Sequence, residues 1–308
     1  MLLFRKEGLL KEGKVNIQKI AIAGAGTMGY SMAEIFAARG YEVTLYNHRA
    51  STLEKAKTKI APETVNRIAY TTAMGEFAGK DLIVECIAEN MDLKLAFYKE
   101  LSEIVDDETI IATNTSGLSI NKLASAVKKP DRFLGMHWFN PPTLIPLIEI
   151  IRNDQTRGDV AQAIYDLSVA IGKKPAIVNK DVPGFAANRI QLAVLREVCS
   201  MVEDGVISKE GADAVMKYGL GFRWACLGPL ETVDFGGIDT FFHISEYLIP
   251  DLEDSHDVPK ILADAYQAGN YGVKTGKGFY DYSGDKAKEV TKSRDEKLQK
   301  IYDALYKK

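Results

Sequence analysis

A glycine-rich turn between an expected strand and an expected helix constrains this chain more than any other feature. The apolar residues 20–23 lead directly into Gly24-Ala25-Gly26-Thr27-Met28-Gly29, and helical spacing continues from residue 32 to residue 39. In this context the first glycine permits the turn, the second lets the backbone approach a pyrophosphate, and the third lets helix and strand pack. Free N–H groups at the helix start attract that anion. The pattern predicts a dinucleotide site formed by Gly24, Gly26, Thr27, Met28 and Gly29.

Short apolar runs and helical patterns alternate over roughly the first 180 residues. Further strands are expected at residues 42–46, 67–71, 81–86, 109–113, 132–136, 144–151 and 175–179, and helices at 91–105, 120–127 and 160–171. Unbroken apolar strands that alternate with helices are typical of a sheet covered on both faces. The sequence therefore predicts the α/β class, with a doubly wound, mostly parallel, Rossmann-type sheet.

The pattern changes after residue 181, where strand alternation stops. Helical spacing runs through residues 185–202, 210–216 and 240–248, and a charged stretch at 285–308 is expected to form a solvated helix. We predict an NAD(P)-binding domain at 15–181 and a smaller all-α domain at 182–308. The long apolar first helix of the second domain is a candidate dimer face, so a homodimer is expected.

The end of the second strand lacks the acid that usually binds the adenosine ribose. Asn47-His48-Arg49 stands there instead, and nothing in it repels a 2′-phosphate. Arg49 beside His48 therefore favours NADP. The alternative is NAD held by Asn47, with Arg49 in solvent.

The strongest candidate for acid–base chemistry is His137 with Glu149. Glu149 is the lone acid in the apolar run 144–151, and a buried carboxylate without a partner is costly. Pro141 and Pro142 let the chain double back and bring Glu149 beside the imidazole. We expect a proton-transfer pair. The alternative is a histidine bonded to a backbone carbonyl and a glutamate paired with a lysine.

Other polar residues follow strand ends, where parallel sheets bind ligands. Ser116 is expected to hold a substrate oxygen, although it could instead cap the next helix, for which Ser119 is equally suited. Asn188, at the start of the second domain, is expected to face the same site, or else to be an ordinary helix residue.

Composition excludes several functional classes. A net charge of −3 provides no footprint for nucleic acid or an anionic membrane. Three scattered cysteines and four histidines suggest neither a disulfide framework nor a metal site, which fits a cytoplasmic protein. No run approaches the length of a membrane span, no signal peptide is expected, and residues 1–14 are interpreted as a loose extension.

Together these pieces resemble the L-3-hydroxyacyl-CoA dehydrogenase family from about residue 19 to residue 282. The matching stretches are residues 24–29, 85–94, 114–116, 137–149, 181–189 and 272–280. The resemblance implies an oxidoreductase of fatty acid metabolism that moves a hydride between a substrate C3 and nicotinamide. It implies that His137 is the general base, that Glu149 orients it, and that Ser116 and Asn188 contact the reacting oxygen. It adds four cofactor contacts: Glu89, Lys94, Asn140 and Lys274.

Three departures from the family pattern argue against a CoA substrate and against NAD as the cofactor. Asn47 replaces the family's acid, and residues 50–67 are too short for the helical pair that helps hold CoA. Residues 140–147 and 219–232 look similar to the L-gulonate 3-dehydrogenase and lambda-crystallin branch, to which carnitine dehydrogenases are also similar. Arg223 is then a candidate seat for a free carboxylate, or a structural partner of Glu231.

Three other functions stay open at this point. A dehydrogenase of a free 3-hydroxy acid would use the same His137–Glu149 pair. A crystallin-like structural protein or a nucleotide-binding regulator would need no such pair.

Overall fold

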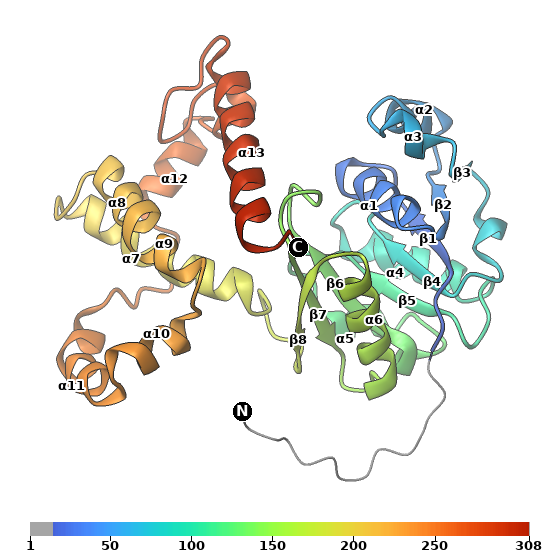
Figure 1. The fold of residues 1–308 in the computed structure, drawn as a ribbon, viewed down its shortest axis with the longest axis horizontal. Coiled ribbons are helices and arrows are strands. Elements are labelled where there is room, and N and C mark those ends of the chain that lie inside the picture. Colours follow the sequence, from blue (N-terminus) through green and yellow to red (C-terminus); the bar gives the residue numbers. More distant parts are fainter. Residues whose placement is uncertain (1–14, 308) are drawn as a thin grey trace. The chain divides into compact units, whose positions relative to one another are not determined.

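The computed structural model describes residues 15–307, so the expected N-terminal extension lies outside the described residues. It contains two compact units, one ending at Ala187 and one beginning at Asn188 (Figure 1). The family-like stretches before residue 187 belong to the first unit. Each unit is described by itself.

The first unit is built on one eight-stranded sheet with the order β3-β2-β1-β4-β5-β6-β7-β8. Only the β6–β7 pair is antiparallel, so the prediction of a mostly parallel sheet is confirmed. The strands are β1 Lys19–Ala23, β2 Glu42–Tyr46, β3 Ile68–Thr71, β4 Leu82–Glu85, β5 Ile110–Thr113, β6 Phe133–Trp138, β7 Leu147–Arg152 and β8 Lys174–Val178.

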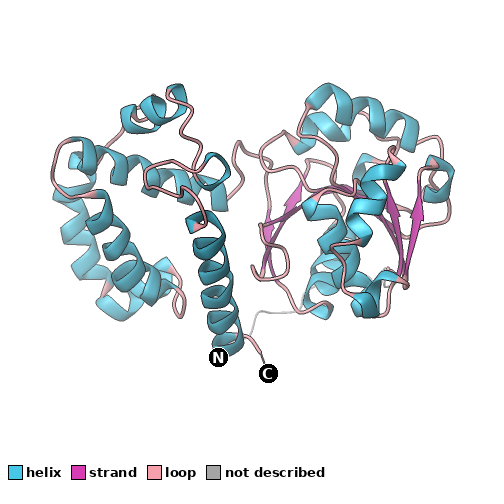
Figure 2. Ribbon diagram, turned by 90° about the horizontal axis from the view of Figure 1, so that it is seen from above, coloured by secondary structure: helices cyan, strands magenta, loops and turns pink. Residues whose placement is uncertain are grey.

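Helices cover both faces of this sheet (Figure 2). Met32 and Phe36 of α1 pack with Ile164 of α6 in one core, while Leu101 of α4 and Leu123 of α5 belong to a second core. Two separate cores explain why the central strands are apolar on both faces. The helices are α1 Thr27–Ala38, α2 Ala50–Lys57, α3 Pro62–Val65, α4 Met91–Leu101, α5 Ile120–Ala124 and α6 Gly158–Ala170, with short helices η1 Met74–Phe77 and η2 Pro130–Arg132.

The segment between β2 and β3 corrects one expectation. We expected the helical pair of the CoA-using members to be lost here, but the segment forms α2 and α3. Leu53, Ala56 and Ile60 are buried in the first core, which is why so short a segment still folds as helices. Two short helices therefore lie between β2 and β3.

The described part of the second unit is helical apart from isolated bridges that join Gly272 to Lys277 and Lys277 to Asp281. Its helix α13 contains no buried residue, as expected for a solvated helix. Its helices are α7 Ala187–Glu203, α8 Lys209–Val215, η3 Met216–Leu220, α9 Gly221–Trp224, α10 Pro229–Gly236, α11 Ile238–Leu248, η4 Ile249–Asp251, α12 Lys260–Gln267, η5 Val273–Thr275 and α13 Lys286–Leu305; α7 starts at the last residue of the first unit. Over residues 15–307, no helix combines the length and apolarity needed to cross a membrane.

Candidate active site

The glycine turn after β1 brings the backbones of strand and helix close together and leaves open space beside Gly26. Gly24 has φ 113°, and a Cβ there would lie 2.5 Å from the Cys86 carbonyl oxygen. A Cβ on Gly29 would lie 1.8 Å from the Gly24 carbonyl oxygen, so helix and strand pack too closely for any side chain. A Cβ on Gly26 would instead meet open space. The helix that follows has neither a side-chain cap nor an acid in its first turn, which leaves its N–H groups for an anion.

The end of β2 carries no acid that could reach a ribose. Asn47 uses its side-chain oxygen to accept the backbone N–H of Arg49 at 3.0 Å. His48 and Arg49 are exposed. In the described part of the chain no carboxylate forms an ion pair with Arg49, so its guanidinium remains available to a ligand.

His137 and Glu149 lie side by side because β6 and β7 are antiparallel and place the two residues directly opposite each other. The His137 Nδ1 lies 2.9 Å from Glu149 Oε2, and both side chains are buried. The carboxylate accepts the Nδ1–H, which leaves Nε2 as the basic nitrogen. His137 Nδ1 thus bonds to Glu149 and not to a backbone carbonyl, and Glu149 pairs with His137 and not with a lysine.

Both oxygens of Glu149 are committed. Oε1 accepts the backbone N–H groups of Ala186 at 3.0 Å and Ala187 at 2.8 Å. Burial alone would raise the pKa of Glu149, but the hydrogen bonds from His137, Ala187 and Ala186 outweigh it and lower this pKa. Glu149 therefore remains ionised beside the imidazole.

Lys94 of α4, expected as a cofactor contact, is buried rather than open to a ligand. Its ammonium forms ion pairs with Glu85 and with Glu89, the latter at 3.5 Å. Glu89 in turn accepts hydrogen bonds from the Thr115 hydroxyl and the Ser116 N–H. The half-exposed Glu89 carboxylate is the part of this cluster that a cofactor can reach.

Sequence reasoning missed Glu85, which anchors this cluster. Besides Lys94, it accepts the Ile87 N–H at 2.6 Å, the Tyr98 hydroxyl at 2.6 Å and the Thr113 hydroxyl at 2.8 Å. Burial and the Glu85 charge raise the pKa of Tyr98 well above its ordinary value, so Tyr98 stays a donor. The signal was present, because Glu85, like Glu149, is an acid in an apolar strand.

The remaining predicted residues fall into two groups. Ser116 and Asn140 are exposed beyond the ends of β5 and β6, and Ser119 caps α5. Asn188, Arg223 and Lys274 belong to the second unit, so their roles stay predictions. Glu231 bonds to the Gly228 N–H at the start of α10, and no ion pair joins it to Arg223 in residues 15–307.

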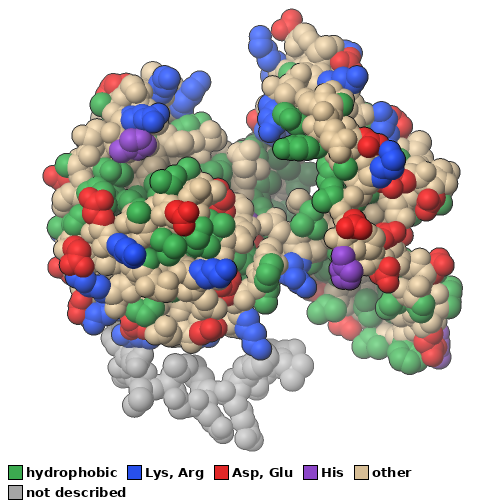
Figure 3. Space-filling view, turned by 180° about the vertical axis from the view of Figure 1, so that it is seen from behind, with side chains coloured by type: hydrophobic (Ala, Val, Ile, Leu, Met, Phe, Trp, Pro, Cys, Tyr) green, Lys and Arg blue, Asp and Glu red, His purple; other side chains and the backbone are tan. Residues whose placement is uncertain are grey.

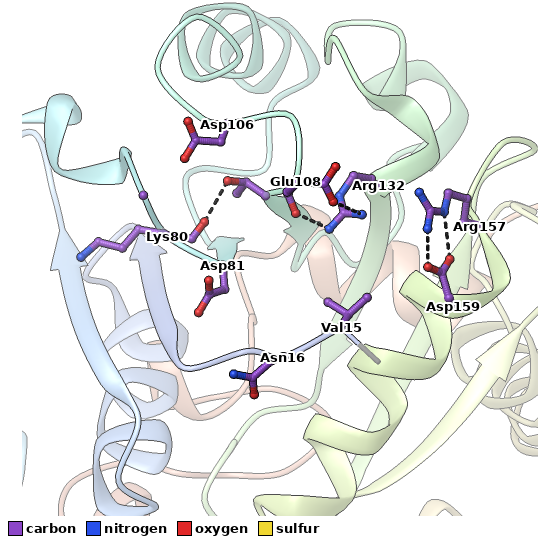
Figure 4. A pocket seen from close by; sticks show the side chains of 11 residues that line it. Val15, Asn16, Lys80, Asp81, Asp106, Glu108, Arg132, Arg157 and Asp159 are labelled. Atoms are coloured by element: carbon purple, nitrogen blue, oxygen red, sulfur yellow. Dashed lines mark hydrogen bonds and ion pairs between the residues drawn. The ribbon is translucent and has the colours of Figure 1, made fainter. Parts of the chain in front are cut away.

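A hollow of about 500 Å³ at the opposite edge of the sheet is not the active site (Figure 4). Arg132 there contacts Glu108, and Arg157 pairs with Asp159. Ligands of such sheets bind at the carboxyl ends of the strands. Among the described residues no cluster of three or more His, Cys, Asp and Glu could hold a metal ion.

Comparison with known proteins agrees with this geometry over both units. Residues 19–182 match the family model "3-hydroxyacyl-CoA dehydrogenase, NAD binding domain", and residues 184–282 match "3-hydroxyacyl-CoA dehydrogenase, C-terminal domain". The chain belongs to the 3-hydroxyacyl-CoA dehydrogenase family. As a member of this family it is an oxidoreductase that acts on CH–OH groups and has an NAD-binding domain, as the resemblance predicted.

Two relatives show the range of the 3-hydroxyacyl-CoA dehydrogenase family. The chain is 38% identical to a probable 3-hydroxybutyryl-CoA dehydrogenase of Deinococcus radiodurans, over 86% of this chain and 100% of the relative. It is 35% identical to 5-formyl-3-hydroxy-2-methylpyridine 4-carboxylate 5-dehydrogenase of Mesorhizobium japonicum, over 92% of this chain and 96% of the relative.

Solved structures show the same two kinds of relative. A 5-formyl-3-hydroxy-2-methylpyridine 4-carboxylic acid 5-dehydrogenase, described as an NAD+-dependent dismutase, has a TM-score of 0.88 at 34% identity and covers 94% of this chain and 99% of its own. The (S)-3-hydroxybutyryl-CoA dehydrogenase of Ralstonia eutropha has a TM-score of 0.72 at 33% identity, with 87% and 100% covered. These findings do not favour the L-gulonate, carnitine or crystallin alternatives.

Proposed function

We propose that this chain is an NAD(P)-dependent dehydrogenase of the 3-hydroxyacyl-CoA type, which interconverts a C3 hydroxyl and a keto group. The observation that carries this proposal is the buried His137–Glu149 pair near the carboxyl end of β6, the sheet edge that also carries the glycine turn. Relatives named 3-hydroxybutyryl-CoA dehydrogenase support the substrate class. A role in fatty acid metabolism would follow from that class.

The chain's own residues supply the proton transfer. A bound nicotinamide would supply the hydride acceptor or donor. In oxidation His137 Nε2 takes the hydroxyl proton, and Glu149 stabilises the imidazolium that forms. In reduction the imidazolium returns the proton to the new hydroxyl. Ser116 and Asn188 are proposed to hold the reacting oxygen.

The test is steady-state kinetics of His137→Gln with acetoacetyl-CoA and NADH. We expect kcat to fall by about 10²–10⁴, the usual contribution of a general acid–base group. His243→Gln is a matched control, because His243 also pairs with a glutamate, Glu246 at 3.0 Å, but on an exposed helix surface. Turnover by His137→Gln near that of the control would refute the proposal.

A second candidate substrate is a small aromatic carboxylate such as the pyridine carboxylate named for the relative from Mesorhizobium japonicum. Its solved counterpart has a TM-score of 0.88, against 0.72 for the 3-hydroxybutyryl-CoA enzyme. The shortness of α2 and α3 also favours a substrate without CoA. Arg223 would then bind the free carboxylate in a bidentate manner.

A screen of acetoacetyl-CoA, acetoacetate and the pyridine aldehyde acid separates the two candidates. If the free acid is preferred, Arg223→Ala should raise its KM, with Arg294→Ala as a surface control. An unchanged KM would remove Arg223 from the site.

For the cofactor, we propose NAD(P) with a preference for NADP. The exposed Arg49 and His48, with Asn47 in place of an acid, would accept a 2′-phosphate. Glu89, positioned by Lys94, together with Asn140 and Lys274, would complete the cofactor contacts. If this is correct, kcat/KM should be higher with NADPH than with NADH, and Arg49→Ala should abolish the difference. Equal values in the unaltered enzyme would contradict the preference.

We also propose that the chain acts as a cytoplasmic homodimer. Hydrophobic side chains gather at the surface over α10 and α11 (Figure 3), and α7 exposes Ile190 and Leu192. Apolar surface of this extent is typical of an interface. All three cysteines are free, which suits a reducing compartment.

A further inference from the structure

Residues 184–187, which end a turn and begin α7, contact both members of the proton-transfer pair. The Phe185 ring lies 5.7 Å from the His137 ring, centroid to centroid, at an interplanar angle of 62°. The next two N–H groups, of Ala186 and Ala187, donate to Glu149 Oε1. One short segment therefore touches the imidazole with a side chain and the carboxylate with its backbone.

The backbone of this turn is strained. Phe185 has φ 54°, and among the described residues no other non-glycine residue has a positive φ. Gly184 before it has φ 78°. A bulky residue rarely adopts this conformation, and such strain persists only where the surroundings hold it. The conformation directs the Phe185 ring inward, where it is 1% exposed, and turns the following N–H groups toward Glu149.

The turn is fastened at its start. Asp181 accepts the Ser119 hydroxyl at 2.7 Å and the Asn121 N–H at 2.9 Å, which ties the segment to α5. The Phe185 N–H donates to the Val182 carbonyl at 3.0 Å and closes the turn. The segment is thus held at both ends, by α5 and by Glu149.

We propose that the strained turn 184–187 is a third part of the proton-transfer unit, with Phe185 as the positioning residue for His137. The Phe185 ring limits rotation of the imidazole away from Glu149, in addition to the Phe139 ring, whose centroid lies 4.4 Å from that of His137. The two N–H groups fix the carboxylate so that Oε2 faces Nδ1. This inference rests on the proposed function, in which His137 is the base.

The first test is Phe185→Leu, which keeps an apolar side chain but removes the ring. We expect kcat to fall about tenfold to hundredfold, because small misplacements of reacting groups have effects of this size. The KM for the dinucleotide should not change. In the oxidation direction, which needs the neutral imidazole, the acid limb of the kcat/KM profile should move to lower pH, because an imidazolium free to rotate is stabilised less by Glu149.

Phe133→Leu is the matched control. Phe133 is a buried phenylalanine on the same strand as His137, but its ring packs on Tyr98 at 5.1 Å. It should lose thermal stability to a similar degree while its kcat and pH profile stay those of the unaltered enzyme. If Phe185→Leu behaves like this control, the proposal is overturned.

A second variant tests the backbone half of the turn. Ala187→Pro removes one N–H to Glu149 at the first position of α7, where proline suits a helix. We expect a folded protein with reduced kcat. A folded Ala187→Pro enzyme with unaltered turnover would contradict the role of the turn.

A measurement without substrate separates this inference from the proposed function. The Nδ1–H of His137 should produce a low-field proton NMR resonance that is absent in His137→Gln. It should broaden through faster exchange in Phe185→Leu and stay sharp in Phe133→Leu. If the resonance behaves in this way but the enzyme turns over no hydroxy substrate, the positioning role of Phe185 is supported and the proposed function is refuted. A resonance equally sharp in both variants overturns the positioning alone.

Discussion

Glu85 and Glu149 show how this chain keeps acids inside its sheet. Each carboxylate is buried, and each accepts at least three hydrogen bonds. Such acids are tolerated because their desolvation is offset by several donors. Glu149 contacts the imidazole of His137, whereas Glu85 contacts the ammonium of Lys94.

Removing the Glu85 charge should destabilise the first unit. Glu85→Gln leaves the buried Lys94 ammonium without a buried counter-charge, and it places an amide N–H among groups that are themselves donors. We expect the free energy of unfolding to fall by about 3–5 kcal/mol. Urea unfolding should be followed by Trp138 fluorescence in a Trp224→Phe background, because Trp138 lies in the first unit. Glu103→Gln, which breaks the exposed pair with Lys128, should lose about 0–1 kcal/mol. Equal losses would contradict the role of Glu85.

Lys173 predicts a pH dependence at the residue scale. Its ammonium donates to the Pro142 carbonyl and to the Ile145 carbonyl at 2.8 Å, and burial lowers the pKa of Lys173 to about 8. Between pH 8 and its ordinary value of 10.5, the unfolded chain binds more protons than the folded one, so stability should rise with pH. A neutral amine still has two N–H groups for the two carbonyls.

The free energy of unfolding should rise by up to about 3 kcal/mol, because each pKa unit of difference between the folded and unfolded chain corresponds to about 1.36 kcal/mol. It is measured as the difference in Trp138-detected unfolding free energy between the unaltered chain and Lys173→Met across this pH window. A difference that does not vary with pH would contradict the lowered pKa of Lys173 in the folded chain.

At the scale of elements, two glycines between β1 and α1 are expected to have different roles, one in stability and one in cofactor binding. Gly29→Ala should lower the melting temperature, because its Cβ would overlap the Gly24 carbonyl. Gly26→Ala should leave it unchanged, since space is open there, but weaken dinucleotide binding at least about tenfold by obstructing the pyrophosphate. Calorimetry and a dinucleotide titration measure the two effects. If a folded Gly26→Ala variant bound the dinucleotide with unaltered affinity, the pyrophosphate could not lie beside Gly26.

Elements with a strong pattern could be predicted from the sequence, and elements held by tertiary contacts could not. The apolar strands and the His137–Glu149 pairing follow from hydrophobic runs and from two prolines. The helices α2 and α3 carry little periodicity of their own and depend on burial of Leu53 and Ile60. The backbone strain at Phe185 has no sequence signal, because only the folded turn requires it.

At the scale of the whole molecule, the apolar surface of the second unit should hold two copies together. Phe235 is 81% exposed, with Ile238 and Phe242 also exposed nearby on α10 and α11. Light scattering after gel filtration should give twice the chain mass, and Phe235→Asp should give the monomer mass. Val206→Asp, at an isolated exposed valine between α7 and α8, should stay dimeric. A monomeric unaltered chain would contradict the dimer.

The antiparallel pairing of β6 and β7 has one more consequence. His137 and Glu149 are only twelve residues apart in sequence, and a single hairpin supplies both. The spacing of the two side chains therefore depends on the register of this one strand pair. A shift of that register by a single residue would turn one of them to the other face of the sheet and break the pair.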